Sequence, residues 1–374
     1  MRHSLALLPD VVPKEARAEK GDGIVIVPKT KSAARKSAGF AVLVAMVSLG
    51  HIPARPSTMR PDTAPATAAV GLAYLWKNPT DIASRNLYYG PGGKEHTPHT
   101  TYTFIKEDLN NTNPKFDVRD ENGVKWKVKL GVEARPEVVA SRLVWAVGYY
   151  ADEDYFVPEL RVANIPRLKR GQKLVGPNGT LHNVRLKRSV KGQEKMGDWK
   201  WNDNPFTRRR EFNGLRVVMA LINNWDLKDE NNAVYEEKRG DSGAPELHYA
   251  VSDLGASFGT TGRSLTHSMS KGNLKAFQRS KFIGKKTSEY VDFYVPSRPA
   301  LVYLATPKEF FSRVDMRWIG RHIPRSDAQW IGGLLAQLSP DQIRDAFRAA
   351  GYTPDQVDAY ALLVEKRIAE LKQL

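Results

Sequence analysis

Four polar residues in the second half of the chain have the types and spacing that chemistry on phosphate requires. Asp226 is followed by Lys228 two positions later and by Asn231 five positions later, and Asp253 precedes a glycine after an apolar, strand-like run. Phosphoryl transfer needs a base aimed at the acceptor hydroxyl, a cation near the moving group, and oxygen ligands for Mg²⁺. The pattern therefore predicts use of ATP and Mg²⁺, with Asp226 as the base, Lys228 as the neutralising cation, and Asn231 and Asp253 as metal ligands.

Residues that would hold the nucleotide lie in the first half. Lys129 ends an alternating stretch, and Glu137 follows eight positions later at the start of an expected helix, where its carboxylate can hold the lysine ammonium against phosphates. The loop 110–113 joins two expected strands, and its backbone amides at Asn111 and Thr112 can contact phosphate oxygens. All these groups fall in the chain order that ATP-dependent phosphoryl transfer uses.

For two of these site residues, another residue of the same type lies close by in the sequence. Lys125 and Lys127 alternate with Lys129, so the three lysines can form a solvated strand face; the glutamate after the strand favours the last of them. Asn232 is adjacent to Asn231, and the five-residue interval after the candidate base favours Asn231 as the metal ligand.

The elements expected around the first half are strands and one helix. An Asn-Gly pair at 122–123 signals a tight hairpin, and alternating apolar residues follow it. The patterns predict a helix from 136 to about 148 and strands near 101–105, 115–118, 124–130, 155–162 and 181–190. The result is a small antiparallel sheet that carries one helix.

The patterns in the second half of the chain predict a higher helix content. An amphipathic helix over 211–223 leads to the candidate base, and strands at 233–235 and 247–251 lead to Asp253. Two final helices are expected to begin at Ser339-Pro340 and Thr353-Pro354, because each start has a capping hydroxyl, a proline at the first helical position and a glutamine three residues after the cap.

With these parts in this order, the chain resembles the protein-kinase-like superfamily, in an atypical branch near the HipA-type, CotH-type and phosphatidylinositol kinases. The most specific part of the resemblance is Asp226-Leu227-Lys228-x-x-Asn231 together with Asp253-Leu254-Gly255. The resemblance implies an α+β, two-lobed fold with a nucleotide between the lobes. The small, antiparallel β-rich N-lobe with one helix would cover 101–190, the larger and mainly helical C-lobe 191–374, and the hinge about 190–201.

Three features depart from typical protein kinases. A Gly-rich phosphate loop is missing, Asn224-Trp225 stands where His-Arg is usual, and only eight positions separate Lys129 from Glu137. The first and third departures argue against ordinary protein-kinase specificity. The phosphoryl acceptor stays open among a protein side chain, a sugar, a lipid headgroup and a small molecule. A non-catalytic binding or scaffold module with the same fold is the alternative from a different class.

A serine hydrolase is a further alternative. The stretch 255–259 matches the G-x-S-x-G nucleophile pattern around Ser257, and Asp292 and His322 follow in the order of an α/β-hydrolase triad. Such an elbow requires a helix directly after the serine, whereas polar, turn-forming residues follow Ser257. This weakens the hydrolase interpretation.

Composition excludes some classes of site. The chain has no cysteine, so it can form neither a disulfide nor a thiolate metal site. Its formal charge is +16, but the 10 Lys/Arg and 4 Asp/Glu of the first 60 residues already account for +6. Arg208-Arg209-Arg210 after two tryptophans is the clearest basic run, and a solvated helix start explains it better than base stacking. We expect no specific nucleic-acid partner.

The N-terminal part has the composition of a leader and a linker. Residues 38–50 form an apolar run preceded by basic residues, which is the order of an export signal, and the run is short for a membrane span. We expect a leader or export signal over 1–52 and a linker with an N-terminal extension over 53–100. The protein is then exported to the periplasm or cell surface, with this apolar segment as a membrane tether if it is retained.

Overall fold

The computed structural model describes residues 24–26, 71–110, 113–237, 245–261, 270–295 and 316–374. The apolar run at 38–50 and the loop residues Asn111 and Thr112 lie outside these ranges. Within them, no helix is both long enough and apolar enough to cross a bilayer. The mixture of helices and separate sheets confirms the expected α+β class.

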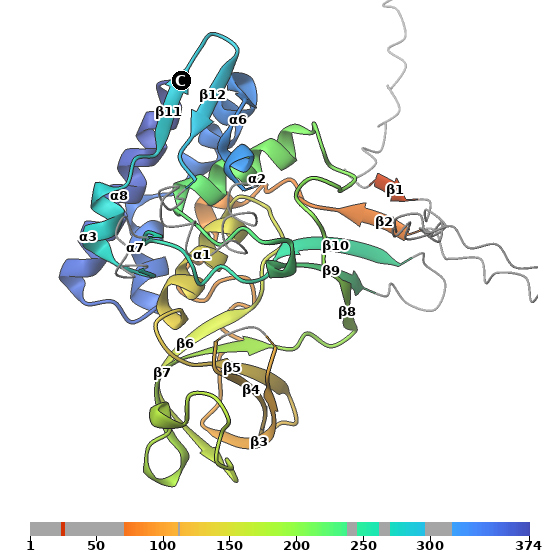
Figure 1. Ribbon diagram of the computed structural model, residues 1–374, viewed down its shortest axis with the longest axis vertical. Coiled ribbons are helices and arrows are strands. Elements are labelled where there is room, and N and C mark those ends of the chain that lie inside the picture. The colour runs from red at the N-terminus through yellow and green to blue at the C-terminus, as the bar shows by residue number, and fades with distance from the viewer. Residues whose placement is uncertain (1–23, 27–70, 111–112, 238–244, 262–269, 296–315) are drawn as a thin grey trace, which may run out of the picture.

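Five strands form a closed barrel at one end of the molecule (Figure 1). They are β3 (Thr101–Asp108), β4 (Lys115–Asp120), β5 (Lys125–Lys129), β6 (Asp154–Ala163) and β7 (Thr180–Arg188), in the order β3-β4-β5-β7-β6. All five were expected, and Gly123, with φ +81°, makes the predicted turn before β5. The barrel closes through a parallel pairing of Thr101–Thr103 with Arg161–Ala163. The expectation of a wholly antiparallel sheet was therefore wrong at this one pair.

Alternation along β5 separates two environments. Trp126 and Val128 point into the apolar core of the barrel. Lys125, Lys127 and Lys129 lie on the other face, and their side-chain exposures are 44%, 32% and 4%. The last lysine is thus buried under the element that follows, and the three lysines do not form one solvated face.

That element is α1 (Ala134–Ala146), which covers the outside of the barrel next to β6 and β7. Its apolar side chains, including Val139, Leu143 and Val144, belong to the larger apolar core and not to the core inside the barrel. The helix also contacts α7 near the C-terminus. The helix expected in the small lobe is therefore anchored in the larger part of the molecule, because its apolar stripe faces that way.

A second sheet has the strand order β1-β2-β10-β9-β8. Its strands are β1 (Ile24–Ile26), β2 (Gly71–Tyr74), β8 (Gln193–Gly197), β9 (Asn232–Glu237) and β10 (Glu246–Val251). β8 falls in the stretch expected as a hinge and pairs with β9. β2 pairs in parallel with β10, and Leu75 and Trp76 after it are buried. Residues 71–76, expected within a linker and extension, thus contribute to the larger core.

Helices make up most of the remainder: α2 (Arg210–Leu221), α3 (Leu274–Arg279), α6 (Arg325–Leu335), α7 (Pro340–Ala349) and α8 (Pro354–Lys372). A small sheet of β11 (Ile283–Lys286), β12 (Tyr290–Phe293) and β13 (Ile323–Pro324) packs with them. Both predicted capping boxes are present. Ser339 Oγ accepts from the Gln342 amide at 3.2 Å, and Gln342 Oε1 accepts from the Ser339 amide at 2.9 Å.

Candidate active site

The ammonium of Lys129 lies among three carboxylates where the barrel meets the larger part of the molecule. Its Nζ is 2.8 Å from Glu137 Oε2, 3.0 Å from Asp253 Oδ1 and 3.2 Å from Glu133 Oε2. The three acids come from the start of α1 and from the residues after β10. The structure therefore brings together Lys129, Glu137 and Asp253, which lie far apart in the sequence, as the sequence analysis predicted.

Arg185 is a further cation beneath this cluster. It lies opposite Lys129 in the β5–β7 register, and like charges in such cross-strand positions repel each other. Glu137 relieves the repulsion, because its second oxygen accepts from Arg185 Nη2 at 2.8 Å while the first contacts Lys129. Burial lowers the pKa of Arg185, but attraction by Glu137 and Asp154 outweighs it, so the guanidinium stays charged. Glu137 is thus held by both cations.

Asp253 is fixed to the loop of the candidate base by backbone hydrogen bonds. The amides of Ser252 and Asp253 both donate to the carbonyl oxygen of Asn231, at 2.9 and 3.1 Å. The side-chain amide of Asn231 in turn donates to the carbonyl of Asp226 at 2.5 Å. These three bonds hold Asp226, Asn231 and Asp253 in one rigid unit, and Asn231 is only 6% exposed.

The loop that carries Asp226 begins directly after α2. Asn223 has φ +54°, a left-handed conformation that asparagine tolerates better than most residues, and it turns the chain after the helix. Asn224 is fully buried and its side-chain oxygen accepts from the Asp226 amide at 3.1 Å. A short 3₁₀ turn, η4 (Asp229–Asn231), then leads into β9. Asn224, which with Trp225 replaces the usual His-Arg, therefore fixes the position of this loop.

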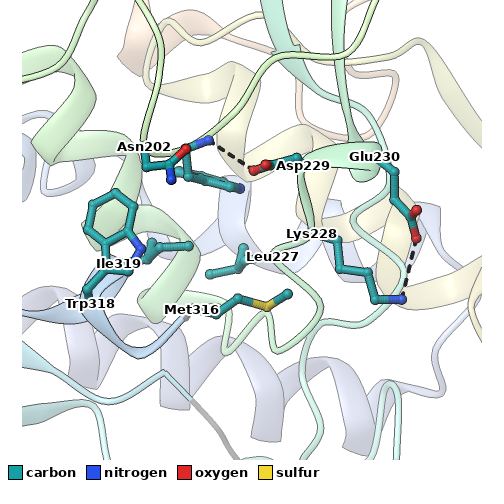
Figure 2. Close-up of a pocket in the computed structure, with 9 residues that line it drawn as sticks. Asn202, Leu227, Lys228, Asp229, Glu230, Met316, Trp318 and Ile319 are labelled. Carbon is teal, nitrogen blue, oxygen red and sulfur yellow. Dashed lines mark hydrogen bonds and ion pairs between the residues drawn. The ribbon is translucent and has the colours of Figure 1, made fainter. Parts of the chain in front are cut away.

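Lys228 faces a neighbouring cavity of about 340 Å³ (Figure 2). Its ammonium is 3.5 Å from Asp226 Oδ1 and 3.5 Å from Glu230 Oε1. Apolar and aromatic side chains line most of the cavity: Trp201, Leu227, Met316, Trp318 and Ile319. Lys228 thus connects the candidate base with this cavity and does not touch the cluster around Lys129 in any contact among the described residues.

A buried polar group lies beside the cluster. Lys187 Nζ is 3.0 Å from Asp152 Oδ2, and the hydroxyls of Ser252 and Tyr235 donate to the same carboxylate at 2.6 and 3.1 Å. Lys187 lies on β7 and Asp152 just before β6, whereas Tyr235 lies on β9 and Ser252 at the end of β10. The group therefore joins the barrel to the second sheet. Because Ser252 directly precedes Asp253, these contacts help to hold Asp253 in place.

The charge state of Asp253 follows from this environment. Burial would raise its pKa, but the charge and hydrogen bond of Lys129 outweigh burial and lower the pKa to about 2. The carboxylate is therefore ionised at neutral pH, as a metal ligand must be.

This shift predicts a dependence of stability on pH. Because the folded-state pKa lies below 3.8, the ordinary value for an aspartate, the stabilisation is complete above 3.8 and is lost as the pH falls toward about 2. We expect Asp253 to contribute about 2 kcal/mol to the free energy of unfolding at neutral pH. Urea unfolding of the wild type and Asp253→Asn between about pH 5 and pH 2 checks this. A stability difference that does not shrink on acidification would contradict it.

Two members of the cluster, Glu133 and Arg185, were missed in the sequence analysis. Glu133 lies four residues after Lys129 and one helical turn before Glu137, and its spacing from Glu137 was a usable signal. Arg185 had no local signal, because only the β5–β7 register places it next to Glu137.

The hydrolase candidate Ser257 does not have the surroundings of a nucleophile. The side chain is fully buried, and its hydroxyl has no hydrogen-bond partner among the described residues. Asp292 accepts from the backbone amide of His322 at 2.8 Å, so this contact does not involve the imidazole. Among the described residues after Ser257, which leave out 262–269, the first helix is α3 at Leu274. A serine nucleophile needs substrate access and a base within hydrogen-bond distance, and Ser257 shows neither.

Two solved structures are similar to this chain in outline. One is the proinflammatory kinase CtkA of Helicobacter pylori, with 10% identity and a TM-score of 0.42 over 74% of this chain and 97% of that one. The other is Rio2 kinase of Chaetomium thermophilum in an ADP/Mg²⁺-phosphoaspartate complex, with 9% identity and a TM-score of 0.30 over 71% and 70%. No protein-family model and no curated protein matches the sequence. At these TM-scores neither likeness decides the activity, which must be judged from the side chains themselves.

Proposed function

We propose that this protein transfers the terminal phosphoryl group of ATP, in the presence of Mg²⁺, to an acceptor hydroxyl. The observation that carries the proposal is the contact of one buried ammonium with two separate carboxylates. Lys129 Nζ lies 2.8 Å from Glu137 and 3.0 Å from Asp253. A lysine oriented in this way by a helix glutamate, next to an aspartate that precedes a glycine, is the arrangement that binds nucleotide phosphates and metal in phosphoryl transfer.

The residues present fit a magnesium ion. The side chain of Asp253 is 29% exposed, against 4% for Lys129 and 1% for Glu137, so Asp253 is the part of this contact that a ligand can reach. Asn231 uses its amide nitrogen on Asp226, which leaves its side-chain oxygen for coordination. Magnesium prefers one or two such oxygens and the phosphates of the nucleotide. When bound by Asp253 and Asn231, the ion would neutralise charge on those phosphates.

Glu133, Glu137 and Asp253 also approach one another closely enough to surround a cation, within 4.8 Å. The Lys129 ammonium already contacts all three. We therefore assign the buried acids to the lysine, and Asp253 with Asn231 to the metal.

The remaining roles follow from position. Lys129 binds phosphate oxygens, while Glu137 and Arg185 keep its side chain in place. Asp226, in the loop that Asn231 ties to Asp253, accepts the proton of the acceptor hydroxyl. Lys228, 3.5 Å from Asp226, offsets negative charge near that carboxylate and lines the adjoining cavity.

The proposal predicts that ATP binding depends on a divalent metal and on Asp253. We expect the full-length protein to bind ATP with Mg²⁺, and Asp253→Asn to weaken this binding by about tenfold or more, because an ionised ligand is lost. Isothermal titration calorimetry with and without Mg²⁺ measures both effects.

Asp358→Asn is the matched control, because Asp358 is 69% exposed on α8 and pairs only with Arg344 among the described contacts. Its affinity should equal that of the wild type. If the wild type bound no ATP with any divalent cation, the chain would be a scaffold, and phosphoryl transfer would be excluded.

A further inference from the structure

A cavity of about 720 Å³ opens where the start of α1 meets the barrel and the C-terminal helices. Four basic side chains line it, namely Arg135, Lys173, His182 and Lys271. None of the fourteen lining residues is acidic. The size is that of a small-molecule site, and the one-sided charge favours an anion.

Arg135 is held ready for such a ligand. Its guanidinium lies 5.3 Å from the ring of Phe156 and 5.7 Å from that of Tyr352, and its Nη2 donates to Asn183 Oδ1 at 3.0 Å. These partners are neutral, so they fix the planar group without cancelling its charge. A pre-positioned guanidinium loses little conformational entropy on binding a phosphate group, and its fork of donors matches phosphate oxygens.

The other lining groups complement the arginine. Lys173 and His182 come from the barrel side, and both side chains are exposed. Gln356 and Tyr352 come from the C-terminal side and carry neutral hydrogen-bonding groups. A ligand in the cavity would therefore meet charge from two directions and neutral donors from a third.

Lys271 connects this cavity with the candidate active site. It forms an ion pair with Glu133 Oε1, and the other oxygen of Glu133 lies 3.2 Å from Lys129 Nζ. The Lys271 ammonium is also 5.5 Å from the ring of Trp225, the residue before Asp226. An anion that attracts Lys271 would compete with Glu133 for it, so binding in the cavity would act on the carboxylates around Lys129.

We propose that this basic cavity binds a phosphate-bearing small molecule at a site separate from the Lys129 cluster. The proposal goes beyond phosphoryl transfer and does not depend on it, because it requires only the cations that line the cavity.

The test is calorimetric titration of the full-length protein with inorganic pyrophosphate, without nucleotide or divalent metal. We expect saturable binding to one site, and a loss of affinity of at least about tenfold in the double variant Arg135→Gln/Lys173→Gln, because two charged contacts are removed. Lys286→Gln, an exposed lysine on β11 away from the cavity, should bind as the wild type does.

Three results would overturn the proposal. They are no binding by the wild type, equal affinity in the double variant, and an equal loss in Lys286→Gln, which would indicate nonspecific surface charge. Lys129→Met separates the two sites. If it removed pyrophosphate binding while the double variant kept it, the anion would sit at the Lys129 cluster. Lys173→Gln alone, at an exposed position, should still weaken binding if the double variant fails to fold.

Discussion

Asp226→Asn should lower the rate of phosphoryl transfer by about 10²- to 10⁴-fold, the usual contribution of a positioned general base. The amide keeps the size of the side chain but cannot accept the proton of the acceptor hydroxyl. Nucleotide binding should change little, because the backbone carbonyl of Asp226, and not its carboxylate, accepts from Asn231. Single-turnover transfer from labelled ATP, together with calorimetric ATP affinity, measures the two effects separately.

Glu230→Gln provides the control for this experiment. Glu230 lies in the same loop, is 55% exposed and also contacts Lys228, so its loss disturbs the lysine in a similar way without removing the base. We expect a rate close to that of the wild type. Equal rates in Asp226→Asn and the wild type would remove Asp226 from the reaction, and parallel losses of rate and of ATP affinity would make it a structural residue.

Lys129→Met should destabilise the protein by about 3–5 kcal/mol, because it leaves buried carboxylates without their shared cation. Glu137 and Glu133 are 1% and 4% exposed, so water cannot replace the ammonium. Any folded fraction should also have lost affinity for ATP, because the ammonium that we propose to bind phosphates is absent. Urea unfolding measures the first effect, and ATP titration below the unfolding transition measures the second.

Lys125→Met on the same strand is the matched comparison. Lys125 is 44% exposed, and its partner Asp117 also contacts Lys127, so the change should cost about 1 kcal/mol or less. If both variants lost the same stability, strand packing rather than charge would explain the result. If Lys129→Met were as stable as the wild type, the three carboxylates would not depend on this ammonium.

Local patterns in the sequence were sufficient for the barrel strands, for β9 and β10, for α1, α2, α7 and α8, and for part of the site. The Ser-Pro-x-Gln start of α7 satisfies its own backbone groups, and the alternation in β5 reports directly which residues enter the barrel core. Lys129 and Glu137 could be paired in advance, because a strand followed closely by a helix brings its last residue near the first helical turn. The order of residues around Asp226 and Asp253 gave the rest of the prediction.

Local patterns could not predict the contacts between segments that lie far apart in the sequence. Closure of the barrel depends on Thr101–Thr103 meeting Arg161–Ala163, and β2 reaches β10 across more than half of the described chain. Neither pairing leaves a periodic signal in one sequence. Arg185 was missed for the same reason, since only the strand register reveals that a buried arginine faces the helix glutamate.

The anchoring of α1 limits how this site can be controlled. To swing the helix away and separate Glu137 from Lys129, side chains such as Leu143 and Val144 would have to leave the larger core, at about 1.5–3 kcal/mol each. The barrel has its own apolar interior, so a tilt of the barrel as a unit would leave that interior packed and would move Phe156 of β6 relative to the larger core. Rotation of α1 is therefore disfavoured as a way to switch the site. A tilt of the barrel would instead change the distance between Lys129 and Glu137.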